Sequence, residues 1–82
     1  MGNKRIGFIG ILIEDRVKSA AKVNTLLSEF GSSILSRVGL PCRDKGVHVI
    51  TLVVDATTDE VGSLTGKLGA LEGVSVKSAL AK

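Results

Sequence analysis

The chain has 82 residues, 44% of them hydrophobic, and Phe8 and Phe30 are its only aromatic side chains. This length predicts a single domain over residues 1–82 whose core is built from Ile, Leu and Val. The net charge of +3 comes from eleven basic residues that are spread among acidic ones, without the dense basic stripe or stacking aromatic residues of nucleic-acid modules. We therefore expect no direct binding of nucleic acid.

The sequence also argues against secretion and membrane insertion. It shows no charged and apolar leader, and no apolar run approaches the roughly 18 residues that span a membrane. A single cysteine, Cys42, excludes an intramolecular disulfide and fits a reducing compartment. We expect a soluble, cytoplasmic protein that makes no membrane contact.

Residues 4–13 are predicted to form the first strand, because aliphatic side chains occupy both alternating sets of positions. Asp15 is the expected N-cap of a helix over residues 16–30, since its carboxylate can accept hydrogen bonds from N–H groups of the first turn. Apolar and small side chains recur in this segment at steps of three and four, which predicts one buried stripe. The stripe contains Val17, Ala20, Ala21, Asn24, Leu27 and Phe30.

Gly31 is the expected left-handed C-cap of this helix. A short second strand is predicted over residues 34–38, and Gly-Leu-Pro at 39–41 is expected to end it. The charged residues 42–46 then predict the turn of a long-looped hairpin.

The third strand is predicted over residues 47–54, which are rich in β-branched side chains and contain neither Gly nor Pro. Both alternating faces are apolar. One face carries Ile50, Leu52 and Val54, and the other carries Val47, Val49 and Val53.

The last third of the chain predicts a helix followed by a strand. Thr57 or Thr58 is the expected N-cap, and the acidic residues that follow suit the positive end of the helix dipole. Gly73 is expected to stop the helix, and residues 74–80 alternate as a final strand. The buried stripe of this helix is predicted to contain Val61, Leu64, Leu68 and Leu71.

The element order strand, helix, strand, strand, helix, strand predicts an α+β fold of the ferredoxin-like βαββαβ type. Right-handed crossovers place the first and third strands at the centre of a four-stranded antiparallel sheet of order 4-1-3-2, with both helices on one face. The central strands are the two that are apolar on both faces. The residues of the third strand that face away from the helices therefore need another cover, and we expect a homo-oligomer, a dimer or a tetramer, with Val47, Val49, Thr51 and Val53 in its interface.

Motifs for catalysis, cofactors and metals are weak. Gly62 to Lys67 looks like a phosphate loop, but it has the wrong glycine spacing and falls inside a predicted helix. No Ser, His and Asp set is present, so we expect neither an enzyme nor a cofactor. Cys42 and His48 are the only soft metal ligands, so we expect no metal site; a site shared by these two residues is the alternative.

Four glycines, Gly62, Gly66, Gly69 and Gly73, are predicted to lie on one side of the second helix, away from its leucines. Each lowers helix stability by up to about 1 kcal/mol relative to alanine. They indicate either close approach of another backbone or ligand, or tolerance of a weak helix.

The junction Glu14-Asp15-Arg16-Val17 is the best candidate for ligand binding. A loop that leads into a helix N-terminus offers free N–H groups and a positive dipole end, which suit a small anionic or zwitterionic ligand. The alternative is that Asp15 is only a cap and Arg16 only a solvated side chain.

Several segments together resemble the iron-only hydrogenase system regulators of anaerobic bacteria. They are Ile-Glu-Asp-Arg at 13–16, Val-Asn-Thr-Leu-Leu at 23–27, Ile-Leu-Ser-Arg-Val-Gly-Leu-Pro at 34–41, Gly-Ser-Leu-Thr-Gly-Lys-Leu-Gly at 62–69 and Gly-Val-Ser-Val-Lys at 73–77. That family is similar to ACT domains and to the effector-binding domain of the nickel-responsive repressor. Those relatives are ferredoxin-like, oligomerise, and bind small effectors or metal near subunit interfaces.

The resemblance implies a regulatory, non-catalytic role connected with hydrogenase expression or maturation. This sequence departs from those relatives at two points. The histidine cluster of the nickel-responsive domain is absent, since only His48 and Cys42 are present, and Glu14 to Val17 replace the usual ACT glycine after the first strand.

Two hypotheses follow. The first is a ligand-binding regulatory module that acts as an oligomer on a protein partner. The second is a structural or interaction module without a small ligand, in which residues 14–17 and 41–46 contact other proteins.

Overall fold

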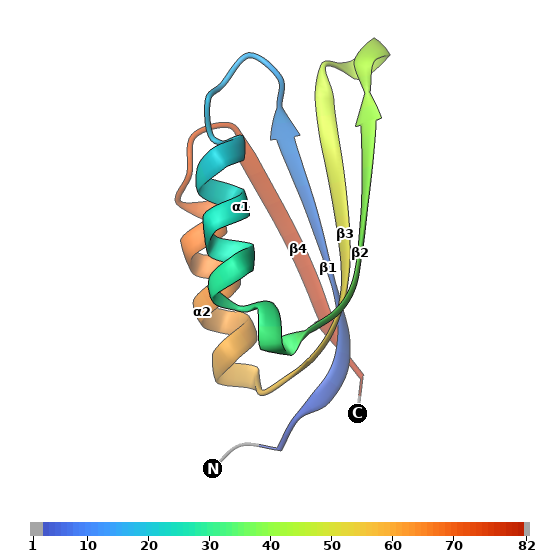
Figure 1. The fold of residues 1–82 in the computed structure, drawn as a ribbon, viewed down its shortest axis with the longest axis vertical. Coiled ribbons are helices and arrows are strands. Elements are labelled where there is room, and N and C mark those ends of the chain that lie inside the picture. The colour runs from blue at the N-terminus through green and yellow to red at the C-terminus, as the bar shows by residue number, and fades with distance from the viewer. Residues whose placement is uncertain (1–2, 82) are drawn as a thin grey trace.

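The two strands that are apolar on both faces form the centre of the sheet in the computed structural model, which describes residues 3–81 (Figure 1). They are β1 (Arg5–Glu14) and β3 (Val47–Ala56), which pair antiparallel along their whole length. β4 (Val74–Leu80) pairs with the other edge of β1, and β2 (Ile34–Cys42) with the other edge of β3. The resulting order β2-β3-β1-β4 confirms the predicted ferredoxin-like sheet. Residues 1, 2 and 82 of the predicted domain lie outside the described part.

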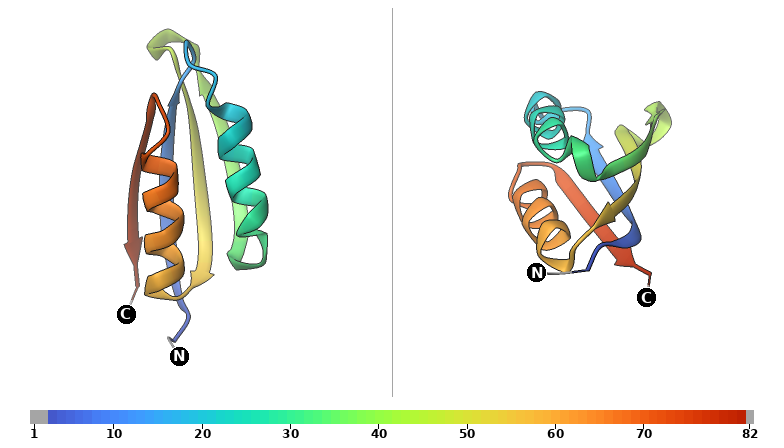
Figure 2. Two further views of the ribbon diagram at one scale, coloured as in Figure 1. Left: turned by 90° about the vertical axis from the view of Figure 1, so that its left-hand side faces the viewer. Right: turned by 60° about the horizontal axis from the view of Figure 1, so that its bottom comes forward.

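Both helices, α1 (Ala20–Glu29) and α2 (Thr58–Gly69), cover the same face of the sheet (Figure 2). The core lies between them and the central strands. Ile9 pairs with Leu52 and Ile11 with Ile50 on this face, and all four side chains are at most 3% exposed. The helices contribute the buried side chains Val23, Leu27, Val61, Leu64 and Leu68.

α2 begins at a capping box. The Thr57 hydroxyl accepts a hydrogen bond from the Glu60 N–H at 3.1 Å, and the Glu60 carboxylate accepts one from the Thr57 N–H at 2.9 Å. The buried Ser33 hydroxyl donates to the same carboxylate at 3.1 Å. These bonds favour the charged form, and the backbone bond from Thr57 is the main reason that the pKa of Glu60 lies below its ordinary value. Thr57, one of the two predicted N-caps, is the cap.

The other predictions for α2 and β4 also agree closely with the structure. Val61, Leu64 and Leu68 are buried and Leu71 is partly buried against the core, as the stripe predicts. β4 has the predicted bounds. The helix ends at Gly69, earlier than expected, and Gly73 instead supplies the positive φ of 70° that turns the chain into β4.

The start of α1 differs from the prediction. The helix begins at Ala20 with Ser19 as its N-cap residue, so the prediction of Asp15 as N-cap is wrong. Residues 15–18 form a turn that tertiary contacts hold in place. Val17 packs against the core and over Gly73, and the Ser19 hydroxyl donates to the Glu72 carbonyl at 2.7 Å.

The buried side of α1 is also rotated from the predicted stripe. Val23 and Leu27 are its buried residues, and Val23 is missing from the prediction. The predicted stripe took its phase from Val17, which precedes the helix, so part of it falls on the exposed side. The three exposed members are Ala20, Ala21 and Asn24.

Gly31 is not a left-handed C-cap, because the glycines with positive φ among residues 3–81 are Gly46 and Gly73. α1 is instead followed by one 3₁₀ turn, Gly31–Ser33. This turn buries Ser33 beside the carboxylate of Glu60. A tertiary hydrogen bond therefore takes the place of the predicted local cap.

β2 is longer than the predicted strand 34–38 and runs through Gly39-Leu40-Pro41 to Cys42. It is an edge strand, where the missing N–H of proline can face solvent without breaking the sheet. A register shift lies between Ile34 and Ser36. The predicted hairpin follows, with a 3₁₀ turn at Arg43–Lys45 and Gly46 at a φ of 67°.

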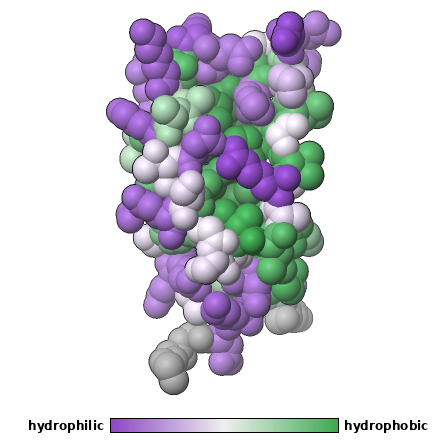
Figure 3. Space-filling view, in the orientation of Figure 1, coloured by the Kyte–Doolittle hydropathy of each residue, from purple (hydrophilic) through white to green (hydrophobic). Residues whose placement is uncertain are grey.

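The sheet face that points away from the helices is uncovered, and the part of it on β1, β2 and β3 is mainly apolar; we call this face the bare face. Its cross-strand rows include Leu40, Val49 and Leu12 in one, and Val53 beside Phe8 in another. Phe8 is 55% exposed and Leu40 is 58% exposed. Figure 3 shows hydrophobic side chains at the surface on the side of β2 and β3.

Replacing Glu60 by Gln should make stability less dependent on pH. The folded-state pKa of Glu60 is lowered, so the charged carboxylate stabilises the fold fully above the unfolded-state pKa, and this contribution is lost as pH falls through the folded-state pKa. The variant should melt below the wild type near neutral pH and level with it at strongly acidic pH. Calorimetry at both pH values measures this. Asp59→Asn, in the same helical turn, is the control and should show a smaller pH-dependent difference; an equal one would contradict this role of Glu60.

Two glycine-to-alanine changes should have opposite effects. A Cβ at Gly73 would lie 2.6 Å from Val17 Cγ2 at a positive φ, so Gly73→Ala should destabilise the fold by about 1–3 kcal/mol. Gly66→Ala meets open space in α2 and should stabilise it by roughly 0.5–1 kcal/mol. Urea denaturation measures both, and a stable Gly73→Ala variant would show that Val17 does not pack as described.

Candidate functional site

A polar hollow opens where the loop after β1 meets the turn between β2 and β3. Its volume is about 430 Å³. Glu14, Asp15 and Arg16 of the predicted ligand-binding stretch line it, whereas Val17 does not, because its side chain packs against the core. The opposite wall consists of Lys45, Gly46 and Val47.

The backbone holds the two walls together. The Asp15 N–H donates to the Gly46 carbonyl at 2.9 Å, and the Glu14 N–H donates to the Gly73 carbonyl at 2.9 Å. Three connections that are far apart in the sequence therefore meet at this end of the sheet. Because α1 begins only at Ala20, the hollow lacks the free helix N-terminus on which the prediction was based.

The hollow contains charges of both signs. An ion pair joins Arg16 Nη2 to Glu14 Oε1 at 2.9 Å, and these side chains are 84% and 42% exposed. Such an exposed pair contributes about 1 kcal/mol or less and can be exchanged for contacts to a ligand. Asp15 and Lys45 add a second carboxylate and a second cation. The arrangement suits a small molecule that carries both an ammonium and a carboxylate group.

Sequence reasoning missed Lys45, Gly46 and Val47. The signal that finds them is the antiparallel register, in which Glu14 pairs with Val47 at the end of both central strands. Pairing of the first and third strands was predicted, but the register was not.

The register separates the two candidate metal ligands. Cys42 pairs with Val47 and Pro41 with His48, and adjacent pairs in a sheet point to opposite faces. Cys42 therefore lies on the bare face, and His48 lies on the helix side beside Gly39. Within residues 3–81 no three His, Cys, Asp or Glu side chains are grouped to hold a metal ion.

The glycine-rich stretch that looks like a phosphate loop lies inside α2, as predicted. Gly62, Gly66 and Gly69 are exposed, and the space beside each of them is open. No helix in the part of the chain that the structure describes is long and apolar enough to cross a membrane.

The predicted interface residues Val47, Val49, Thr51 and Val53 all lie on the bare face, with Thr51 exposed and the three valines partly buried. Val47 also lines the polar hollow. The hollow therefore borders the bare face.

Comparison with models of known protein families shows which family the chain belongs to. The model described as "TM1266-like: Iron-only hydrogenase system regulator, putative" matches residues 5–78. The chain belongs to this family. The match covers every strand and helix described above except the end of β4, so the TM1266-like family and the resemblance seen in the sequence agree.

Solved structures show the same fold. The uncharacterized protein TM1266 from Thermotoga maritima matches this TM1266-like chain with a TM-score of 0.92 at 43% identity, covering 96% of this chain and 99% of that chain. The ACT domain from GTP pyrophosphokinase of Chlorobium tepidum matches with a TM-score of 0.77 at 23% identity, covering 93% and 99%. A formyltetrahydrofolate deformylase from Pseudomonas putida KT2440 matches with 0.63 at 14%, covering 94% of this chain and 29% of that one. The last two likenesses show the fold alone. No curated protein matches the chain.

Proposed function

We propose that the protein is a non-catalytic regulator of the iron-only hydrogenase system that binds a small zwitterionic ligand and acts as an oligomer on a partner protein. Membership of the regulator family supports the regulatory role, and the ACT-like fold supports ligand binding. The proposal places this activity in the cytoplasm and requires no cofactor, no membrane contact and no direct binding of nucleic acid.

The observation that carries the proposal is the polar hollow at the border of the bare face. Arg16 and Lys45 are available to a ligand carboxylate, while Glu14 and Asp15 are available to a ligand ammonium group. Binding would exchange the exposed Arg16–Glu14 pair for contacts to the ligand at small cost.

The bare face supports assembly. Four strands spaced about 4.8 Å apart, with up to ten residues of about 3.3 Å each, give a face of roughly 600 Å² in projection. A standard protein interface buries roughly 800 Å² per partner, so the bare face is of the size that a contact between two copies of this chain needs. Because Val47 belongs to both the hollow and the bare face, a ligand in the hollow would touch the subunit boundary and so bias the assembly.

A thermal-shift screen of amino acids, divalent metals and hydrogenase-related metabolites tests the ligand. At least one zwitterionic compound should raise the melting temperature, since ligand at 100 times its Kd adds about 2.7 kcal/mol of stability. Arg16→Ala should abolish that shift, whereas Lys22→Ala, which removes a cation outside the hollow, should keep it. No stabilisation by any compound would favour the module that contacts proteins without a small ligand.

Val49→Asp should dissociate the oligomer before it unfolds the domain. Its side chain lies between Leu40 and Leu12 on the bare face, so a buried charge there would oppose a second subunit, while the helix-side core stays intact. Light scattering should show an oligomer for the wild type and a monomer for the variant, with the same circular dichroism spectrum for both. Ser63→Asp, an exposed position on α2, is the control. A wild-type monomer would contradict the assembly.

A further inference from the structure

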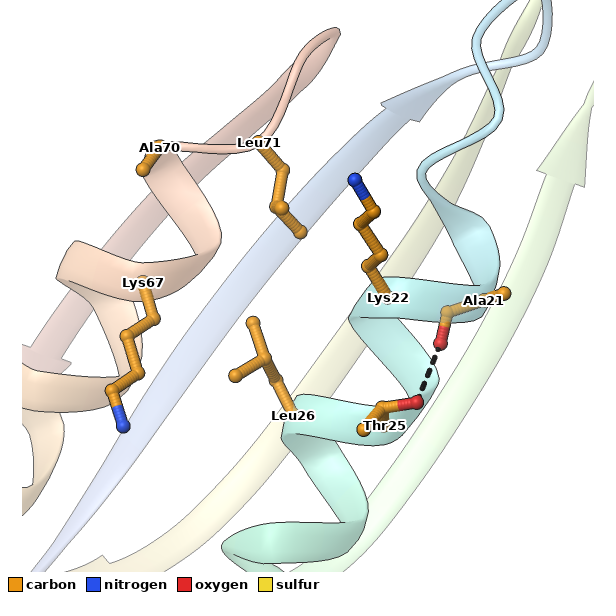
Figure 4. Close-up of a pocket in the computed structure, with 7 residues that line it drawn as sticks. All are labelled: Ala21, Lys22, Thr25, Leu26, Lys67, Ala70 and Leu71. Carbon is orange, nitrogen blue, oxygen red and sulfur yellow. Dashed lines mark hydrogen bonds between the residues drawn. The ribbon is translucent and has the colours of Figure 1, made fainter.

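An apolar groove runs between the two helices on the side of the molecule opposite the bare face. Its volume is about 520 Å³, and it is open to solvent. Leu26 from α1 and Leu71 from the segment after α2 point toward each other within it (Figure 4). Both side chains are only partly buried, although each also packs against the core. We call this the helix groove.

Small residues keep the helix groove open. Ala21 lies on the α1 wall and Ala70 at the end of α2, and both are exposed. Next to Ala70 on the outer side of α2, a Cβ added to Gly66 or Gly69 would meet no heavy atom of another element within 4 Å. The backbone of another element can therefore approach α2 closely.

A lysine flanks the helix groove on each side. Lys22 comes from α1 and Lys67 from α2, and Figure 4 shows their side chains extending in different directions from the two walls. Within residues 3–81 the one ion pair closer than 4.0 Å is Arg16–Glu14, so neither lysine is neutralised by a carboxylate. Lys67 Nζ lies 5.6 Å from the centroid of the Phe30 ring, and because an ammonium group has three N–H donors, it can also donate to an anionic partner.

We propose that the helix groove binds an amphipathic helix of a partner protein, which places an apolar ridge over Leu26 and Leu71 and acidic residues beside Lys22 and Lys67. Two adjacent helices offer a third helix a groove that apolar side chains at positions i, i+3 or i+4, and i+7 can fill. α2 has 12 residues and is about 18 Å long at 1.5 Å per residue, so three turns of the partner suffice.

Charge favours a different protein over a second copy of this chain. A symmetric contact between two helix grooves would bring lysines toward lysines, whereas an acidic helix would pair with them. The two lysines stand on opposite walls, which matches acids on both flanks of a helix better than a single anionic head group. The inference rests on the proposed function in that it names the class of partner, and it does not depend on the polar hollow.

A phage-displayed library of three-turn helical peptides with a randomised outer face, selected against the intact protein, tests this inference. Selected peptides should carry apolar residues at i, i+3 or i+4, and i+7, with Asp or Glu on both flanks. On binding they should shift the methyl NMR signals of Leu26 and Leu71. Lys22→Glu combined with Lys67→Glu should weaken the best peptide about tenfold or more in fluorescence anisotropy.

The control combines Arg16→Glu with Lys45→Glu, which makes the same charge change in the polar hollow and should alter peptide affinity less than about twofold. Peptides that bind equally well to both double variants would overturn the inference. So would signals of Leu26 and Leu71 that change on dilution of the protein alone, because a second copy would then occupy the helix groove. The fatty acid dodecanoate serves as a test of a lipid-like ligand. If it binds in the helix groove and no acidic peptide is selected, the inference is also overturned.

The two proposals can fail separately. In one outcome, peptides bind the Arg16→Glu and Lys45→Glu double variant, and no small molecule stabilises the wild type. This outcome would reject the proposed ligand and support the partner helix. In the opposite outcome, a small molecule stabilises both the wild type and the Lys22→Glu and Lys67→Glu double variant, and no peptide is selected. This outcome would support the ligand and reject the partner helix.

Discussion

Packing of one face of the β1–β3 pair against two helices is the contact on which the rest of the structure depends. Ile9, Ile11, Ile50 and Leu52 are almost fully buried there. Successive side chains of a strand point to opposite faces, so a strand that is apolar at every position buries half of its side chains and leaves the other half outside. Each large apolar side chain contributes roughly 1.5–3 kcal/mol on full burial, so covering the exposed Phe8 and Leu12 on the bare face with another subunit would be favourable.

The same arrangement separates the surfaces that we assign to different partners. The bare face lies on one side of the sheet, and the helix groove lies on the other. The polar hollow lies at the end of the sheet where Glu14, Asp15 and Val17 contact Gly73 and Gly46. A ligand in the hollow would therefore lie next to the loop that leads into α1, and also next to the edge of the bare face. In the proposed function, this position would couple ligand binding to assembly.

Features determined by local chemistry or by strand alternation could be predicted from the sequence. The sheet order, the two-sided central strands, the Thr57 cap and the bounds of β4 are of this kind. Features that depend on tertiary contacts were predicted wrongly: residues 15–18 are held by the turn around Gly73 and not by a helix, and Ser33 bonds to Glu60 in place of a left-handed Gly31. Pro41 remains in a strand because β2 is an edge strand. Half of the hollow, from Lys45 to Val47, was missed because it follows from the register of β1 against β3.

The central claim is that another subunit covers the bare face in solution. Paramagnetic relaxation of methyl signals by a soluble gadolinium chelate measures this cover in the unmodified protein. The methyl groups of Val38, Leu40, Val49 and Val53 should relax about as slowly as those of Ile11 and Leu52 in the core, although Val38 is 62% exposed in the isolated chain. Relaxation of the bare-face methyl groups as fast as that of an exposed side chain would contradict the claim.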